Sequence, residues 1–216
     1  MSEELSRKEL YIQIINLFSS VNSSAKTELI YKTPFELLIA VILSAQCTDK
    51  RVNIVTKELF KKFPEPKDLA NAHFDEIFTL IRSINYPNSK TKYLIKASCL
   101  IVDNYNSIVP SNYYDLIALP GVGRKTANVL LAELFNQDVI AVDTHVFRVS
   151  QRIGLVTNAK NVLDAEKQLT KYIPVGSRSI VHHYLILHGR YVCKARRPDC
   201  KNCVIKNICR FGEKSI

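Results

Sequence analysis

The sequence lacks the features that would send the chain into or across a membrane. No apolar run reaches the roughly 18 residues that a membrane-spanning helix needs. The N-terminal residues from Met1 to Leu5 lack the basic and apolar regions of a signal peptide. These absences argue against a membrane protein, and we therefore expect the chain to stay in the cytoplasm.

The sequence also lacks the sustained alternation of apolar and polar residues that a β-sheet would need. Apolar residues recur instead at helical spacing, as at Leu10, Ile14 and Phe18, and the segment 37–43 is apolar on every side. There is no low-complexity linker and no repeat of solenoid length. We expect an all-α protein with many helices of about ten residues, and the segment 37–43 should cross the centre of a core.

The composition is basic, with a formal charge of +10 over 216 residues. Such a balance suits a polyanionic partner, of which nucleic acid is the usual one. A solvated basic face would give the same composition, so charge alone does not decide. A chain of this length can bury one large core or two modest ones.

Four of the six cysteines lie close together near the C-terminus. In a reducing compartment such a group indicates metal or cluster ligands before disulfides. Zinc and iron–sulfur clusters both use four thiolates, and the single Cys-x₂-Cys spacing leaves both open, with zinc the commoner metal. We expect Cys47 and Cys99 to be buried apolar residues. The four grouped cysteines are Cys193, Cys200, Cys203 and Cys209.

A glycine turn precedes a predicted helix in the middle of the chain. Gly121 and Gly123 flank Val122 just before Arg124. Glycine leaves backbone N–H groups uncovered, and the start of a helix favours anions. We therefore predict that these three residues bind a phosphate, with Thr126 capping the helix or contacting the same phosphate. A tight connection between two helices without any ligand is the alternative.

From this turn to the segment 142–145 the chain resembles the endonuclease III family of DNA glycosylases. The cysteine spacing and the segment 43–49 carry the same resemblance, which covers nearly the whole chain. It implies a helix–hairpin–helix motif and two helical lobes with a DNA-binding cleft between them. One lobe would span residues 27–136, and the other would join 1–26 to 137–216. The second lobe would hold a [4Fe–4S] cluster on the four cysteines.

The activity that this resemblance implies is the excision of an oxidised pyrimidine from double-stranded DNA, followed by strand cleavage. Lys125 would attack C1′ of the extruded nucleotide as a neutral amine and form a Schiff base. A partly desolvated site beside a cation such as Arg124 would favour that neutral form. Asp143 resembles the catalytic carboxylate of the family and is also a good helix N-cap. His145 would contact phosphate or transfer a proton, unless it is only a cleft-wall residue.

The family also inserts side chains from two loops into the space that the extruded base leaves. Gln46 matches the residue of the first loop. In the second loop Tyr86 stands where a leucine is typical, and Asn85 replaces the usual glycine. An aromatic ring could stack on the neighbouring bases, which is worth about 1–3 kcal/mol per base. Alternatively, Tyr86 only ends a helix and packs against Pro87.

Two other functions remain open from the sequence. An adenine-type glycosylase of the same superfamily would lack a lysine at the position of Lys125. A non-catalytic DNA-binding module would not need both Lys125 and Asp143. We expect a bacterial-like monomer associated with the nucleoid. His182 and His183 should either pack within a helix pair or lie on the surface. Five cations of the cysteine loop should contact DNA phosphates, namely Lys194, Arg196, Arg197, Lys201 and Lys206.

Overall fold

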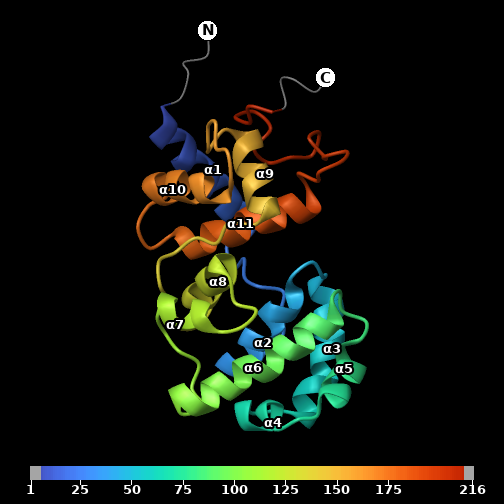
Figure 1. The fold of residues 1–216 in the computed structure, drawn as a ribbon. Coiled ribbons are helices and arrows are strands. Elements are labelled where there is room, and N and C mark those ends of the chain that lie inside the picture. The colour runs from blue at the N-terminus through green and yellow to red at the C-terminus, as the bar shows by residue number, and fades with distance from the viewer. Residues whose placement is uncertain (1–5, 212–216) are drawn as a thin grey trace. The chain divides into compact units, whose positions relative to one another are not determined.

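The computed structural model describes residues 6–211, which form eleven α-helices and no strand (Figure 1). The prediction of an all-α protein is therefore confirmed, and the segment 137–143 is extended chain without regular structure. The helices are α1 (Arg7–Val21), α2 (Pro34–Ser44), α3 (Asp49–Lys62), α4 (Pro66–Ala70), α5 (Phe74–Ile81), α6 (Pro87–Tyr105), α7 (Tyr113–Ala118), α8 (Arg124–Phe135), α9 (Thr144–Ile153), α10 (Val162–Tyr172) and α11 (Arg178–Tyr191).

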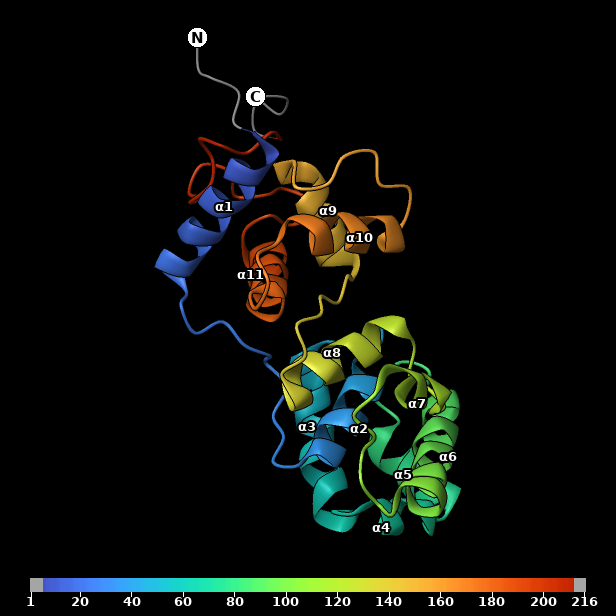
Figure 2. The same ribbon diagram turned by 90° about the vertical axis from the view of Figure 1, so that its left-hand side faces the viewer.

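The chain folds into two compact units, which Figures 1 and 2 show from two sides. The first unit joins Met1–Thr27 to Gln137–Ile216, and it contains α1 and α9 to α11. The second unit is continuous, spans Glu28–Asn136 and contains α2 to α8. The N-terminal helix is thus paired with the C-terminal third of the chain.

The second unit is built around α2. Every side chain from Phe35 to Leu43 is buried, as the apolar sequence of this segment predicts. The helix begins where the Thr33 hydroxyl accepts a hydrogen bond from the Glu36 N–H at 3.2 Å, with Pro34 at the first helical position. Helices α3, α6 and α8 pack against α2. The central position of this helix is therefore confirmed.

The first unit is held by the packing of α9 on α11, with α1 and α10 alongside. Gly189 lets α9 and α11 approach each other closely, because an added Cβ would lie 3.0 Å from the Cβ of His145 and from Cγ2 of Val149. A capping box begins α1: the Ser6 N–H donates to the Glu9 carboxylate at 2.9 Å, and the Ser6 hydroxyl accepts from the Glu9 N–H.

Two local expectations need correction. Cys47 and Cys99 are partly exposed, so the prediction that both are buried is wrong. Cys47 lies in the loop after α2, where its neighbours Ala45 and Gln46 are exposed. Histidines 182 and 183, in contrast, are both buried on α11, in agreement with a packing role. Among residues 6–211, no helix combines the length and apolarity that crossing a bilayer requires.

Candidate functional site

The glycine turn connects α7 to α8 in the second unit. Gly121 has φ +85°, a conformation that side chains strongly disfavour, and an added Cβ would lie 3.1 Å from both Ile42 Cγ2 and Tyr93 Cβ. The Val122 N–H donates to the Leu119 carbonyl at 3.0 Å, which closes the turn. This amide is therefore used within the turn of the protein without DNA, and the predicted contact between the Val122 N–H and a phosphate stays a prediction.

Gly123 is the N-cap of α8 and has no side chain that could bond the first helical amides. These amides have no carbonyl acceptor within the helix, because the first turn of any helix leaves its N–H groups without partners. The Gly123 backbone is extended, with φ −98°, and a Cβ built there would meet nothing within 4 Å. The start of α8 is thus an open, polar surface that suits an anion.

Lys125 lies in the first turn of α8 and is exposed. Its expected neighbour Arg124 interacts with α7: the guanidinium lies 5.7 Å from the ring centroid of Tyr113, and Nη1 donates to the Tyr113 hydroxyl at 3.3 Å. The partly desolvated environment expected for the lysine is absent from this unit by itself. Thr126, one residue further on, is half-buried.

Asp143 is the N-cap of α9 in the first unit, as predicted. Its Oδ1 accepts a hydrogen bond from the Val146 N–H at 2.8 Å, and the residue is partly buried. The preceding segment is anchored to α11, since the His182 Nδ1 lies 2.7 Å from the Ala141 carbonyl oxygen. This anchor gives His182 a role in positioning the Asp143 carboxylate, which the sequence pattern did not indicate.

The same segment is held at its start by a salt bridge. Arg178 Nη1 lies 2.8 Å from Asp138 Oδ2, and the Arg178 N–H donates to Asp138 Oδ1 at 3.0 Å. Both side chains are largely buried, so this ion pair is screened less than a surface pair would be. The backbone that leads to Asp143 is therefore fixed at two points along α11.

His145 is partly buried in the first turn of α9. Its Nδ1 lies 3.3 Å from Arg148 Nη2, and Arg148 also donates to the carbonyl oxygens of Gly189 and Cys193. The imidazole is thus held against α11 through an arginine that reaches the start of the cysteine loop.

Gln46 and Tyr86 belong to two loops of the second unit that contact each other. The Asn85 side-chain amide donates to the Gln46 carbonyl at 2.5 Å. Gln46 and Tyr86 are both exposed and both left-handed, with φ 56° and 58°. Tyr86 is also the N-cap residue of α6, and Asn85, which replaces the usual glycine, does not have a positive φ.

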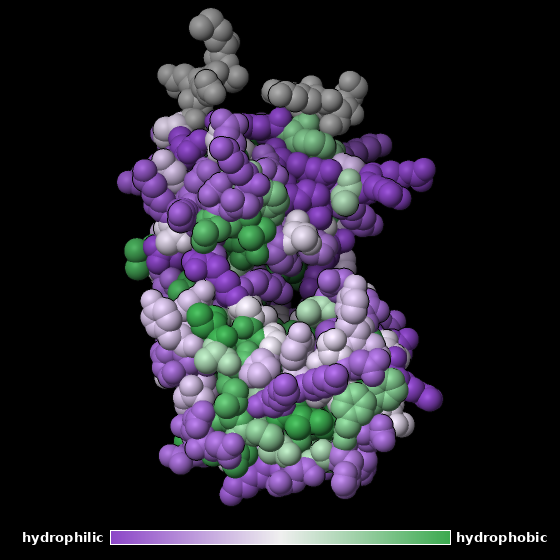
Figure 3. All heavy atoms as spheres, in the orientation of Figure 1, coloured by the Kyte–Doolittle hydropathy of each residue, from purple (hydrophilic) through white to green (hydrophobic). Residues whose placement is uncertain are grey.

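The four cysteines of the C-terminal loop lie in the first unit as reduced thiols, and hydrophilic side chains gather over this loop (upper right in Figure 3). Burial raises the pKa of the Cys203 thiol, and the nearby thiols of Cys193, Cys200 and Cys209 raise it further. Within residues 6–211 the structure contains no group of three or more His, Cys, Asp or Glu side chains arranged to hold a metal ion. The five expected DNA-contacting cations of this loop are all exposed.

Arg152, in the last turn of α9, connects both ends of the cysteine loop. Its Nη1 lies 3.6 Å from Cys193 Sγ and donates to the Lys194 carbonyl at 2.7 Å. Its guanidinium also lies 4.4 Å from the ring centroid of Phe211, and its own carbonyl is 3.9 Å from Cys209 Sγ. Sequence reasoning missed this residue, because nothing in the local pattern distinguishes it from other arginines.

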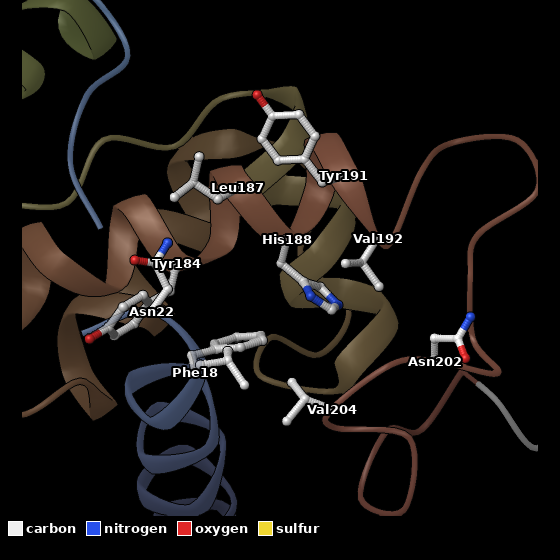
Figure 4. Close-up of a pocket in the computed structure, with 10 residues that line it drawn as sticks. Phe18, Asn22, Tyr184, Leu187, His188, Tyr191, Val192, Asn202 and Val204 are labelled. Atoms are coloured by element: carbon white, nitrogen blue, oxygen red, sulfur yellow. The ribbon is translucent and has the colours of Figure 1, made fainter. Parts of the chain in front are cut away.

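His188 is the second unpredicted neighbour of the cysteines. Its Nε2 lies 3.7 Å from Cys203 Sγ, and burial lowers its pKa to about 4. The ring packs on Phe18, with 4.9 Å between centroids, and forms one wall of a cavity of about 300 Å³ (Figure 4). Residues of α1, α11 and the cysteine loop line this cavity. A neutral imidazole is thus in hydrogen-bonding reach of one thiol.

The structure therefore groups some predicted site residues and separates others by unit. Gln46, Tyr86 and Lys125 belong to the second unit. Asp143 and His145 belong to the first unit, together with the four cysteines. Through Arg148, α9 connects the helix turn that follows Asp143 to the cysteine loop.

Comparisons with known proteins agree on one family. Residues 39–175 match the HhH-GPD superfamily base excision DNA repair protein profile. The chain is 48% identical to endonuclease III of Rickettsia felis over 205 residues, which cover 94% of this chain and 95% of that protein. It is 42% identical to endonuclease III of Escherichia coli K12 over 203 residues, covering 94% and 96%.

Solved structures give the same result for the fold. A trapped covalent intermediate between endonuclease III and DNA matches with a TM-score of 0.92 and 44% identity, covering 98% of this chain and 99% of that one. A thermostable thymine-DNA glycosylase matches with a TM-score of 0.85 at 20% identity, which is a likeness of fold alone.

The two glycines of the turn make a matched pair for mutation. Gly121→Ala should lower the free energy of unfolding by about 1–3 kcal/mol, because it forces a side chain into a left-handed, crowded position. Gly123→Ala should cost less than about 1 kcal/mol, because its site is extended and open. Its methyl group should nevertheless weaken DNA binding, since it covers the amides at the start of α8.

Thermal unfolding and fluorescence anisotropy with an abasic-site duplex would measure the two effects. Unchanged DNA affinity of Gly123→Ala would show that the start of α8 does not contact the DNA.

Proposed function

The chain belongs to the endonuclease III family of the HhH-GPD superfamily of base excision DNA repair proteins, and we propose that it excises oxidised pyrimidines and cleaves the resulting abasic site through Lys125. It is a base excision DNA glycosylase with an associated AP lyase activity. The assignment of Lys125 rests on one observation, namely its exposed position in the first turn of α8, next to amides that suit a phosphate.

In the proposed reaction Lys125 Nζ bonds to C1′ of an extruded nucleotide. The C1′–N bond breaks, and the base leaves with the electron pair and takes up a proton. The amine loses its protons as the sugar ring opens to a Schiff base. Removal of a proton from C2′ then expels the 3′ phosphate, and the strand is cut by β-elimination.

The attacking amine must be neutral, although a free lysine has a pKa of about 10.4, so that only roughly one amine in 2,500 is neutral at pH 7. Lys125 is exposed, and Arg124 is engaged by Tyr113, so the protein alone does little to desolvate it. We infer that bound DNA excludes water from this amine. The reactive form would then arise chiefly at a bound lesion.

Asp143 is proposed to stabilise the positive charge that grows on the deoxyribose and to take part in proton transfer. Its hydrogen bond to the Val146 N–H fixes one carboxylate oxygen and leaves the other for this task. His145, held by Arg148, is proposed to contact a phosphate next to the lesion.

The backbone amides at Gly121 and Gly123 are proposed to hold another phosphate, with Thr126 beside it; such contacts position the strand without reading its sequence. Gln46 and Tyr86 are proposed to fill the space left by the extruded nucleotide. Their exposure and their position on two adjoining loops support this role.

The four cysteines are proposed to bind a [4Fe–4S] cluster. The donor set fits, because four thiols lie together in one loop and four thiolates are the usual ligands of such a cluster. The guanidinium of Arg152 next to Cys193 Sγ supports the same assignment, since an N–H donor near sulfur favours thiolate. The cluster would fix the loop and its exposed cations for contact with DNA phosphates.

Lys125→Ala should abolish the covalent adduct that borohydride traps with abasic DNA, while affinity for that DNA changes little. The experiment compares the mutant with Lys92→Met, which removes an exposed lysine of α6. Undiminished adduct formation by Lys125→Ala would exclude this lysine as the nucleophile, and an adenine-type glycosylase would form no adduct even as wild type.

Asp143→Asn should lower the single-turnover excision rate by about 100-fold or more, because it removes the charge that stabilises the sugar cation. The melting temperature should fall only slightly, since asparagine is as good an N-cap as aspartate. A near-normal rate with wild-type stability would show that Asp143 serves α9 alone.

The purified protein should be brown and carry about four iron atoms per chain, as one [4Fe–4S] cluster requires. Cys200→Ser should lose the colour. Arg152→Met should release iron faster to a chelator, because it removes the donors to Cys193 Sγ and the Lys194 carbonyl.

Arg196→Met is the matched control, since Arg196 is an exposed arginine of the same loop. Elemental analysis that finds one zinc and no iron per chain would overturn the cluster assignment.

A further inference from the structure

The carbonyl groups at the end of α2 and just after it are held by side chains from the Tyr86 loop and from the start of α6. Lys90 Nζ donates to the Leu43 carbonyl at 2.8 Å and to the Ala45 carbonyl at 2.6 Å. The Asn85 amide donates to the next carbonyl along the chain, that of Gln46, at 2.5 Å. Asn85 and Lys90, on either side of Tyr86 in the sequence, thus bind three carbonyl groups at and just before the exposed Gln46.

Lys90 is an unusual residue for this task because only 4% of it is exposed. Burial lowers its pKa, and a buried ammonium group needs hydrogen-bond acceptors that replace water. The C-terminal end of α2 supplies them, since its last carbonyls lack helical partners and carry the negative end of the helix dipole. The Lys90 side chain therefore caps a helix from which it is separated by more than forty residues.

Lys90 also fixes the second loop. Its backbone N–H donates to the Tyr86 carbonyl at 3.1 Å, at the first turn of α6. One residue thus holds the Tyr86 backbone through its amide and the Gln46 loop through its side chain.

The backbone at both exposed residues is strained. Gln46 and Tyr86 are left-handed, with φ 56° and 58°, although neither is a glycine. Such strain persists only where the surroundings over-determine the conformation. The bonds from Asn85 and Lys90 are the contacts that connect these two positions.

We propose that Lys90 and Asn85 are positioning residues. They hold the backbone of Gln46 and Tyr86 in one fixed arrangement, from which both side chains enter the base stack of the DNA. The proposal rests on the proposed role of Gln46 and Tyr86 in filling the space of the extruded nucleotide. It goes beyond that role, because it attributes the fixed positions of Gln46 and Tyr86 to the buried Lys90 and to the side-chain amide of Asn85. A glycine at position 85 could not supply that amide.

The test compares two substrates under single turnover: a duplex with a paired oxidised pyrimidine, and a duplex with a preformed abasic site. Only the first requires a base to be extruded. Asn85→Ala should slow excision from the paired lesion by about 2- to 10-fold, and Lys90→Met by about 10- to 100-fold, because bonds from a charged donor are stronger. Cleavage of the abasic site should change by less than about 2-fold.

Matched controls come from the same helix. Asn88→Ala and Lys92→Met remove an exposed amide and an exposed ammonium group of α6 and should leave the ratio of the two rates unchanged. Melting temperatures identify any variant that fails to fold. If Lys90→Met does not fold, Asn85→Ala still tests the proposal, because Asn85 is exposed and its substitution should leave the fold intact.

A double-mutant cycle separates positioning from independent contact. If Asn85 acts through Gln46, then Asn85→Ala should have less than about a 2-fold effect in a Gln46→Ala background. The positioning role of Asn85 and Lys90 is wrong if the effects of Asn85→Ala and Gln46→Ala multiply. It is also wrong if the Asn85 and Lys90 variants slow both substrates equally. The proposed role of Gln46 in filling the space of the extruded nucleotide would stand in either case. If Gln46→Ala and Tyr86→Ala themselves slow both substrates equally, these two residues do not fill the space of the extruded nucleotide. The positioning role of Asn85 and Lys90 is then wrong as well.

Discussion

Backbone groups at helix ends are the constraint on which the sites of this protein depend. Each helix end leaves amides or carbonyls without partners inside the helix, and a buried end must find partners elsewhere. Asp143 supplies an acceptor at the start of α9. Lys90 supplies donors at the end of α2. At the start of α8 Gly123 supplies no side-chain partner, and this open end is where we propose that a DNA phosphate binds.

Arginines join the elements of the first unit in the same manner. Arg148 donates to the Gly189 and Cys193 carbonyls, and Arg152 donates to those of Lys194 and Ala195. Guanidinium groups suit this task, because their several donors lie in one rigid plane and stay charged at any physiological pH. Helix α9 therefore carries an acidic cap at its start and two basic groups that bind the cysteine loop along its length. The loop depends on α9 for its position before any metal is considered.

Much of the fold could be predicted because its signals are local. The capping residues Ser6, Thr33 and Asp143 each precede a helix whose periodic apolar residues are visible in the sequence, and the all-apolar segment 37–43 can only be a core helix. The start of α4 is marked by a capping pair, Glu65 with Asp68, rather than by an apolar pattern.

The supporting residues of the site could not be predicted. Lys90 contacts a carbonyl 47 residues away, and Arg152 contacts a thiol 41 residues away. A lysine in the first turns of an amphipathic helix reads as solvent-exposed, and only the packing of α6 on α2 turns Lys90 inward. The left-handed conformation of Tyr86 could not be predicted either, since an aromatic residue rarely adopts it and it is visible only in the folded chain.

Two lysines of the second unit, Lys90 and Lys125, lie in opposite environments. Lys90 is buried, so its charge must be satisfied permanently by carbonyl oxygens, and it can only be structural. Lys125 is exposed, so water stabilises its charge until another molecule displaces that water. In the proposed reaction Lys125 becomes neutral only on the substrate, so the amine needs no protection in the free protein. Burial of this amine within the protein would have cost stability, whereas exposure makes its proposed reactivity depend on the close fit of an extruded nucleotide.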